Sequence, residues 1–147
     1  NHAGFIEAVN RLMGSYSSLY AVMIGRDIDH ENPKFRALLS GSKFSERFIL
    51  LGERNDVPEL IKIMDLFCMH SLTEGFPNVV SEAMALGRPC VVTDVGDAAH
   101  IVGNTGLVVP VNDICALSEA IENMISASPE ERRARSRCRR QHQPGRA

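Results

Sequence analysis

The chain has 147 residues, of which 44% are hydrophobic and 23% charged, proportions that fit a single soluble globular domain with a sizeable core. No stretch approaches the roughly 18 apolar residues of a membrane span, and no basic-then-apolar start indicates a signal peptide. The net charge of −2 conceals an asymmetry, because residues 132–147 hold seven basic and no acidic residues, whereas residues 1–131 hold nine basic and 18 acidic ones. This acidic body argues against nucleic acid as a ligand, since phosphate backbones need clustered Lys and Arg.

Strands and helices alternate along the chain. An amphipathic helix is expected first, because apolar residues recur at helical spacing over about residues 3–17. Short apolar runs predict strands at about 19–25, 48–52, 66–70, 90–94 and 107–109. The helices expected between and after them cover about 34–40, 57–64, 77–86, 97–102 and 113–125. This alternation predicts an α/β fold, a Rossmann-like parallel sheet with flanking helices and right-handed crossovers.

Capping residues indicate where several helices begin. Pro33 suits a first helical turn, and Asp56 and Asp113 are expected N-caps. Ser128 is expected to cap a last helix that begins in SPEERR. The segment that follows lacks the apolar spacing of a packed helix, so we divide the chain into a globular domain, 1–131, and a solvated, frayed basic tail, 132–147. A basic arm for nucleic acid or anionic lipid and an altered reading frame are the alternatives for this tail.

The cysteines show no C-x-x-C pair, and two of them lie within apolar strands. We therefore expect small buried hydrophobic residues in a reducing compartment, at Cys68, Cys90, Cys115 and Cys138. No spacing of Cys, His or Asp supports a metal site, and no metal cofactor is expected. The setting expected from these features is cytoplasmic or peripheral to a membrane.

The stretch 66–94, LFCMHSLTEGFPNVVSEAMALGRPCVVTD, is the part from which chemistry can be argued. It predicts a strand, a loop, a helix and a second strand. In open parallel sheets, ligands bind beyond the carboxyl ends of the strands, where helix N-termini present N–H groups to anions. The loop here is short, and Pro77 suits the first helical turn. The backbone amides of Gly75, Phe76 and Asn78 are therefore expected to approach a phosphate.

Two carboxylates accompany this loop. Glu74 lies within it, and Glu82 lies eight residues later, about two turns into the helix. An ionised carboxylate only accepts hydrogen bonds, so this pair suits the hydroxyl groups of a sugar rather than the phosphate. The inferred ligand combines phosphate with polyol. Taken alone, the pair also fits solvated charges at a helix start.

The string E-G-F-P-N-V-V-S-E-A-M-A-L-G resembles the donor site of retaining glycosyltransferases of the GT-B fold, family 4 (group 1). The likeness extends over about 1–131 and includes G-E-R-N-D-V-P-E-L at 52–60, T-D-V-G-D at 93–97 and G-L-V-V-P at 106–110. It implies the donor-binding half of such an enzyme, which transfers a sugar from a nucleotide diphosphate sugar, such as a UDP- or GDP-sugar, to an acceptor hydroxyl with retention.

The resemblance also implies roles for individual residues. Glu74 would contact the transferred sugar as the catalytic carboxylate, and Glu82 would hold the ribose. The amides of the Gly75, Phe76, Pro77 and Asn78 segment would lie by the sugar and diphosphate. Candidates for the nucleobase loop and the ligand edge are Arg54, Asn55, Val57 and Gly25. A surface turn explains 54–57 equally well, Phe76 also suits a plug beneath the loop, and Asn78 also suits a local cap.

The chain departs from the family's pattern in several respects. The family's first strand of this half, which lies centrally and carries basic residues for the diphosphate, has no counterpart, and neither has the N-terminal acceptor-binding half. We therefore expect a fragment with negligible transferase activity, and a gap between strands 19–25 and 66–70 that is left open or closed by their direct pairing. His70 and His100 also depart from the family's residues, and we interpret His70 as a structural residue.

Other functions explain the same residues less well. A non-catalytic nucleotide or nucleotide-sugar-binding module is the main alternative. A response regulator needs a Lys late in the chain, and the last one here is Lys62. A dinucleotide enzyme needs G-x-G-x-x-G after a strand, which does not occur. A sugar-nucleotide epimerase of the same fold fits the E-G-F-P-N segment less well.

Overall fold

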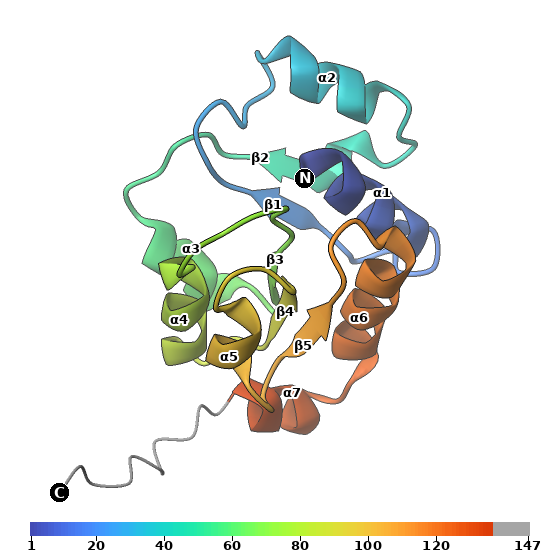
Figure 1. Ribbon diagram of the computed structural model, residues 1–147. Helices are drawn as coiled ribbons and strands as arrows, with labels where there is room; N and C mark the ends of the chain where they lie inside the picture. The colour runs from blue at the N-terminus through green and yellow to red at the C-terminus, as the bar shows by residue number, and fades with distance from the viewer. Residues whose placement is uncertain (137–147) are drawn as a thin grey trace, which may run out of the picture.

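Short parallel strands form the centre of the computed structural model, which describes residues 1–136 (Figure 1). The strands are β1 (Ala21–Met23), β2 (Phe48–Leu50), β3 (Phe67–Met69), β4 (Cys90–Thr93) and β5 (Leu107–Val109). The helices are α1 (His2–Met13), α2 (Pro33–Ser40), α3 (Val57–Ile63), α4 (Asn78–Ala85), α5 (Ala98–Val102), α6 (Ile114–Ser126) and α7 (Pro129–Ser136), with a 3-10 turn η1 (Ser45–Arg47). This order confirms the predicted alternation of strands and helices.

The strands form two sheets rather than one. β1 pairs with β2, with Val22 opposite Ile49. β4 lies between β3 and β5, with Val92 opposite Met69 and Val108. Every pair is parallel, as predicted, and the division falls between β1 and β3. The gap expected at this place is therefore left open.

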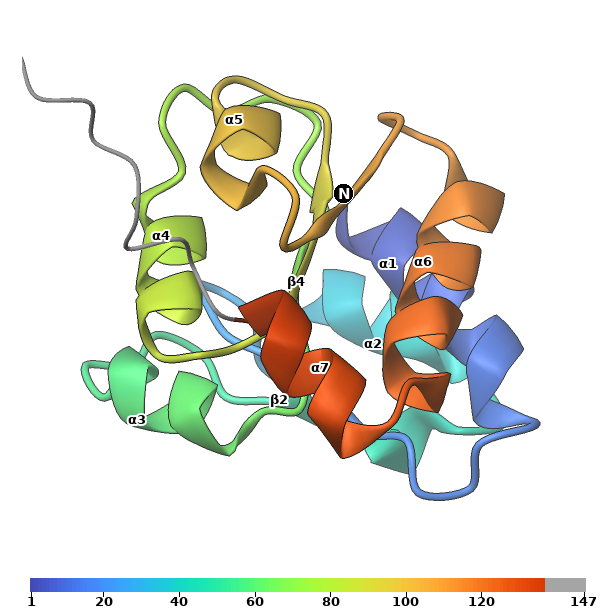
Figure 2. The same cartoon turned by 90° about the horizontal axis from the view of Figure 1, so that it is seen from below.

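Helices cover both sides of these strands. Figures 1 and 2 show α3, α4 and α5 on one side and α1 and α6 on the other. A hydrophobic cluster lies on each side: one includes Met13, Phe48 and Met124, and the other includes Val80 and Val102. All four residues of β4 are buried, as expected of a central strand covered on both faces.

Most predicted elements are present, but several are shorter than the apolar runs suggested. β1, β2 and β3 cover only three residues each, and neither β1 nor β3 has a ladder partner towards the gap. α1 ends at Met13 rather than near residue 17. Gly14 and Ser15, which are both poorer helix formers, begin a turn directly after Met13. Arg47 stabilises this end, since its guanidinium donates to the carbonyls of Met13 and Tyr16 at 3.1 and 3.0 Å.

Local capping chemistry largely follows the sequence. Pro33 is the first residue of α2, and the Asp113 carboxylate accepts a hydrogen bond from the Ala116 amide at 2.8 Å. Ser128 and Glu131 form a reciprocal capping box at the start of α7, which confirms the expected cap. Asp56 is the exception: it occupies the N-cap position of α3, but its carboxylate makes no cap hydrogen bond.

The basic tail predicted over 132–147 overlaps the last helix. α7 continues through Ser136, and Arg132 donates to the carbonyl of Ile125 near the end of α6 at 3.2 Å. The remainder of that segment, 137–147, lies outside the described residues, and so does Cys138. No helix within residues 1–136 has the length and apolar character needed to cross a bilayer.

Candidate functional site

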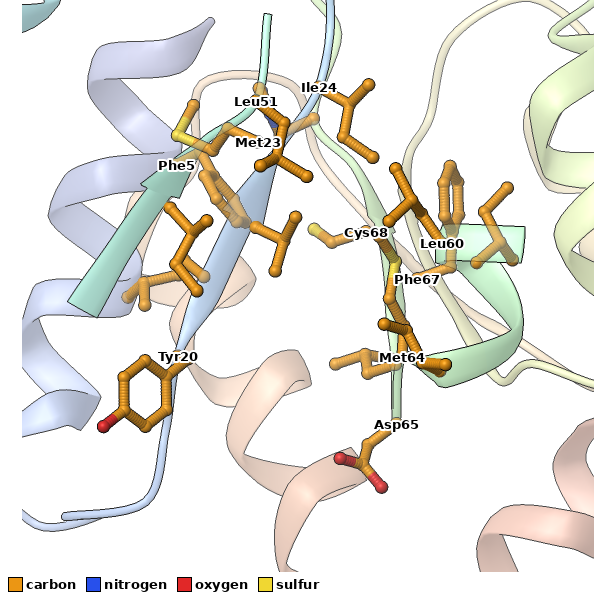
Figure 3. Close-up of a pocket in the computed structure, with 18 of the residues that line it drawn as sticks. Phe5, Tyr20, Met23, Ile24, Leu51, Leu60, Met64, Asp65, Phe67 and Cys68 are labelled. Atoms are coloured by element: carbon orange, nitrogen blue, oxygen red, sulfur yellow. The ribbon is translucent and has the colours of Figure 1, made fainter. Parts of the chain in front are cut away.

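An apolar cavity of about 1030 Å³ occupies the gap between β1 and β3. Figure 3 shows side chains from both strands and from the neighbouring elements pointing into it, with Cys68 extending from β3 towards β1. Met23 and Leu60 also line it, whereas Tyr20 and Asp65 lie at the end where the strands begin. We call this cavity the slot. No part of the described chain forms a strand within it.

The loops that follow β1 and β2 meet on one side of the slot. The Gly25 amide donates to the carbonyl of Gly52 at 2.9 Å, and the Gly52 amide donates to the carbonyl of Ile28 at 2.7 Å. These bonds place Gly25 beside the loop that carries Arg54 and Val57, and all three line the slot. We call these loops the first rim. Asn55 is exposed and is not among the lining residues.

Arg54 is held by its own loop. Its guanidinium donates two hydrogen bonds to the Asp56 carboxylate, from Nε at 2.8 Å and from Nη2 at 2.7 Å. This contact raises the pKa of Arg54 and lowers the pKa of Asp56. The same contact explains why Asp56 does not cap α3. A ligand that engages Arg54 would have to share it with Asp56.

The loop between β3 and α4 lies on the other side of the slot, and we call residues 71–77 the donor loop. Within it, the Ser71 hydroxyl donates to the Glu74 carboxylate at 2.8 Å. Thr93, the last residue of β4, donates through Oγ1 to the Ser71 carbonyl at 2.7 Å. The Asp97 amide donates to the Gly75 carbonyl at 3.0 Å. The donor loop is therefore held against residues 93–97, and together they form the second rim.

Gly75 is a glycine that the fold itself does not require. Its φ is not positive, and a Cβ built there would meet no atom within 4 Å. Gly75 and its neighbour Glu74 are both exposed. The open space above this backbone permits a close approach by a ligand, which is one of the ordinary uses of glycine.

The residues after Gly75 differ in exposure. The Phe76 side chain is 57% exposed, so it does not plug the space beneath the loop. Pro77 is buried at the N-cap position of α4, and Asn78 is the first helical residue; no side chain caps this helix. Glu82 lies in the second turn of α4 and is exposed. α4 therefore begins directly after the donor loop, and the approach of the Gly75, Phe76 and Asn78 amides to a phosphate stays a prediction.

The structure thus gathers the predicted residues into two groups. Gly25, Arg54 and Val57 belong to the first rim and line the slot, whereas the segment 74–78 belongs to the second rim and does not line the slot. Sequence reasoning missed Ser71, Thr93 and Gly96, which hold the second rim together. The T-D-V-G-D motif at 93–97 was the available signal for the last two.

His70 adjoins the slot directly after β3. Its ring stacks on Phe5 with centroids 4.6 Å apart, and it meets His2 edge-on at 5.5 Å. Burial lowers the pKa of His70 to about 4, with the N-terminal amine and His2 adding to the effect. The imidazole is packed as a structural residue, as predicted, but Nδ1 is buried without a hydrogen-bond partner among the described residues.

The cysteines match the expectation in part. Cys90 is buried and Cys68 lies against the slot, and burial raises the pKa of each thiol to about 12. Cys115 was wrongly expected to be buried: it is exposed at the start of α6, where Arg11 lies 3.1 Å from its sulfur. Within residues 1–136, no group of three or more His, Cys, Asp or Glu side chains could hold a metal ion.

Comparison with known proteins gives a consistent result. The family model of the group 1 glycosyl transferases matches residues 1–127. A UDP-Gal:α-D-GlcNAc-diphosphoundecaprenol α-1,3-galactosyltransferase of Escherichia coli is 37% identical over 78 residues, which are 52% of this chain and 20% of that protein. The lipopolysaccharide core biosynthesis mannosyltransferase LpcC of Rhizobium leguminosarum bv. viciae is 32% identical over 127 residues, 83% of this chain and 36% of that protein.

Solved structures agree at the level of the fold. A glycosyltransferase from Rickettsia africae superposes with a TM-score of 0.80 at 23% identity, over 91% of this chain and 37% of that one. The chain therefore spans about a fifth to a third of the curated relatives named above and about a third of this neighbour.

Proposed function

We propose that the chain, which belongs to the group 1 glycosyl transferases and has the fold of one half of a GT-B molecule, binds the nucleotide diphosphate sugar donor of a glycosyltransferase. The observation that carries this proposal is the open backbone at Gly75, beside the exposed carboxylate of Glu74. Nothing within the chain requires glycine there, and the missing side chain leaves room for a ligand to approach the backbone of the loop. The first turn of α4 then offers its N–H groups to the diphosphate.

The donor is oriented by the two rims. Glu82 accepts hydrogen bonds from the ribose hydroxyls, and Glu74, aligned by Ser71 at 2.8 Å, accepts from hydroxyls of the transferred sugar. Gly25, Val57 and the loop at 54–55 contact the nucleobase from the first rim. The protein's share of catalysis is electrostatic, because the helix N-terminus and backbone amides stabilise the charge that develops on the leaving phosphate. Transfer proceeds with retention and without a metal cofactor.

The slot limits what this chain does by itself. We propose that in the whole enzyme a parallel strand fills the slot and carries basic residues to the diphosphate, between the two rims. The acceptor site lies on a further, N-terminal domain. The 147-residue chain therefore has negligible transferase activity, and release of nucleotide from a donor sugar by the purified chain would overturn this expectation. The enzyme acts in the cytoplasm or at the inner face of the membrane.

A calorimetric screen of UDP-, GDP- and ADP-sugars tests the proposal. One nucleotide class should bind selectively, and UDP-sugars come first because the Escherichia coli relative is a UDP-Gal-dependent enzyme. Glu82→Ala should weaken this binding, whereas Glu119→Ala, an exposed glutamate on α6, serves as the matched control. Equal loss in both variants, or no binding by the folded chain, would contradict the proposal.

A non-catalytic module that binds nucleotide or nucleotide sugar is the second candidate. The open slot favours a binding module, because the hydrogen bonds within each rim form although no strand fills the slot. Donor binding without transfer, even after the missing segments are restored, would support this alternative.

A further inference from the structure

Gly96 lies at the closest approach between the two loops of the second rim. Its φ is +49°, a left-handed conformation that favours glycine. A Cβ built at this position would lie 2.5 Å from the carbonyl oxygen of Glu74 and still closer to that of Gly75. Both atoms belong to the backbone, so no rotamer change could relieve the overlap. Any residue larger than glycine would force the two loops apart.

Hydrogen bonds on either side of Gly96 join the same two loops. Thr93 is 2% exposed, and its hydroxyl donates to the Ser71 carbonyl at 2.7 Å. On the other side, the Asp97 amide donates to the Gly75 carbonyl at 3.0 Å. The donor loop is thus fixed near both of its ends by residues 93–97, which we call the supporting turn.

We propose that the supporting turn sets the position of Glu74, with Thr93 and Gly96 as positioning residues for the donor sugar. Thr93 fixes the backbone of Ser71, and the Ser71 hydroxyl in turn aligns the Glu74 carboxylate at 2.8 Å. Gly96 lets the carbonyls of 74 and 75 pack against the turn, so the side chain of Glu74 is directed outwards. The part of this inference that concerns the sugar rests on the proposed function.

The supporting turn holds the donor loop in place, whereas the donor loop is the part of the second rim that contacts the ligand. Thr93 is buried, so its side chain acts on the donor through the donor loop. We assign Gly96 the same indirect role, because its Cβ position lies against the carbonyls of Glu74 and Gly75. Their effect therefore reaches the ligand only through the donor loop. Loss of either residue should weaken contacts with the transferred sugar more than contacts with the nucleotide, which other residues make.

The first measurement needs no ligand. Backbone 15N relaxation is compared between the wild-type chain and Gly96→Ala. Order parameters over 72–76 should fall from about 0.85, typical of rigid backbone, to below about 0.6, while those of β4 and β5 stay unchanged. Gly87→Ala is the matched control: Gly87 also has a positive φ of +74°, but a Cβ there meets nothing within 4 Å. It should leave 72–76 as ordered as in the wild type.

Thr93→Val is a second variant that keeps the shape of the side chain and removes its hydroxyl. It should raise the amide hydrogen-exchange rates of 72–76 by about threefold to tenfold, the factor expected for one lost hydrogen bond, and Thr93→Ser should restore them. Thr105→Val removes a comparable hydroxyl, which bonds the Val102 carbonyl at 2.8 Å, and should have no effect on this loop. An unchanged donor loop in both Gly96→Ala and Thr93→Val would overturn the inference.

The second measurement compares the affinities of UDP and UDP-galactose. If the wild-type chain prefers the sugar nucleotide, Thr93→Val should reduce that preference by about threefold or more while the affinity for UDP changes less than twofold. Equal loss for both ligands would show a merely structural role and overturn the positioning claim. If the wild-type chain binds none of the UDP-, GDP- and ADP-sugars, the proposed function fails, and the relaxation data still decide whether the supporting turn fixes the donor loop.

Discussion

The buried imidazole of His70 predicts a specific loss of stability in mild acid. Burial lowers its pKa from the ordinary 6.5 to about 4 in the folded chain. Between these two values the unfolded chain binds a proton that the folded chain does not, so the free energy of unfolding falls as the pH falls. One pKa unit corresponds to about 1.4 kcal/mol. The contribution of neutral His70 to the free energy of unfolding is fully present above pH 6.5, and about 3 kcal/mol of it is lost by pH 4.

Urea denaturation at pH 7.5 and pH 5.0 measures this effect before most carboxylates titrate. The wild-type chain should lose about 2 kcal/mol more between these pH values than His70→Phe, which keeps a ring against Phe5 but has no proton to gain. His2, whose pKa burial also lowers, remains in both proteins. Parallel pH profiles for the two proteins would refute the reasoning.

Three further substitutions test the scaffold by urea denaturation at neutral pH. Phe48→Ala should lower the free energy of unfolding by about 3 to 5 kcal/mol, because Phe48 is 1% exposed. Phe76, which is 57% exposed, is the control: an equally large loss in Phe76→Ala would refute the burial argument. Arg47→Ala should cost about 1 to 3 kcal/mol, because its guanidinium donates to three carbonyls at the end of α1 and just after it, at 3.0 to 3.2 Å. Full retention of stability in Arg47→Lys would show that charge alone suffices. Asp113→Ala should cost about 1 kcal/mol, with Asp113→Asn close to wild type as the control for its 2.8 Å cap hydrogen bond.

The sequence predicts features that depend on neighbouring residues better than those that depend on the folded chain. Pro33, Asp113 and Ser128 mark helix starts correctly, because a cap needs only the residues of the first turn. Asp56 carries the same signal, yet its carboxylate pairs with Arg54 instead. A bidentate pair with a guanidinium competes successfully with a cap, and the spacing of two residues does not reveal it.

The candidate site shows the same limit. The donor-loop residues Glu74 and Gly75 could be proposed from the loop that follows β3, because parallel sheets place ligands there. The contact of Gly96 with that loop could not, because it joins residues about 20 positions apart and depends on how β3 and β4 pair. The lack of a hydrogen-bond partner for Nδ1 of His70 among the described residues likewise depends on the packing of Phe5 in α1 against the His70 ring, which no sequence pattern reveals.

The central claim is that the two rims bind one nucleotide sugar. Titration of the 15N-labelled chain with UDP-, GDP- and ADP-sugars in turn, followed through backbone amide shifts, tests it most directly. We predict that the shifts are largest at 52–57 in the first rim and at 74–80 in the second, and that Glu82→Ala reduces them at both. Shifts confined to one rim or to other surfaces, or their absence in a chain with a folded spectrum, would contradict the account.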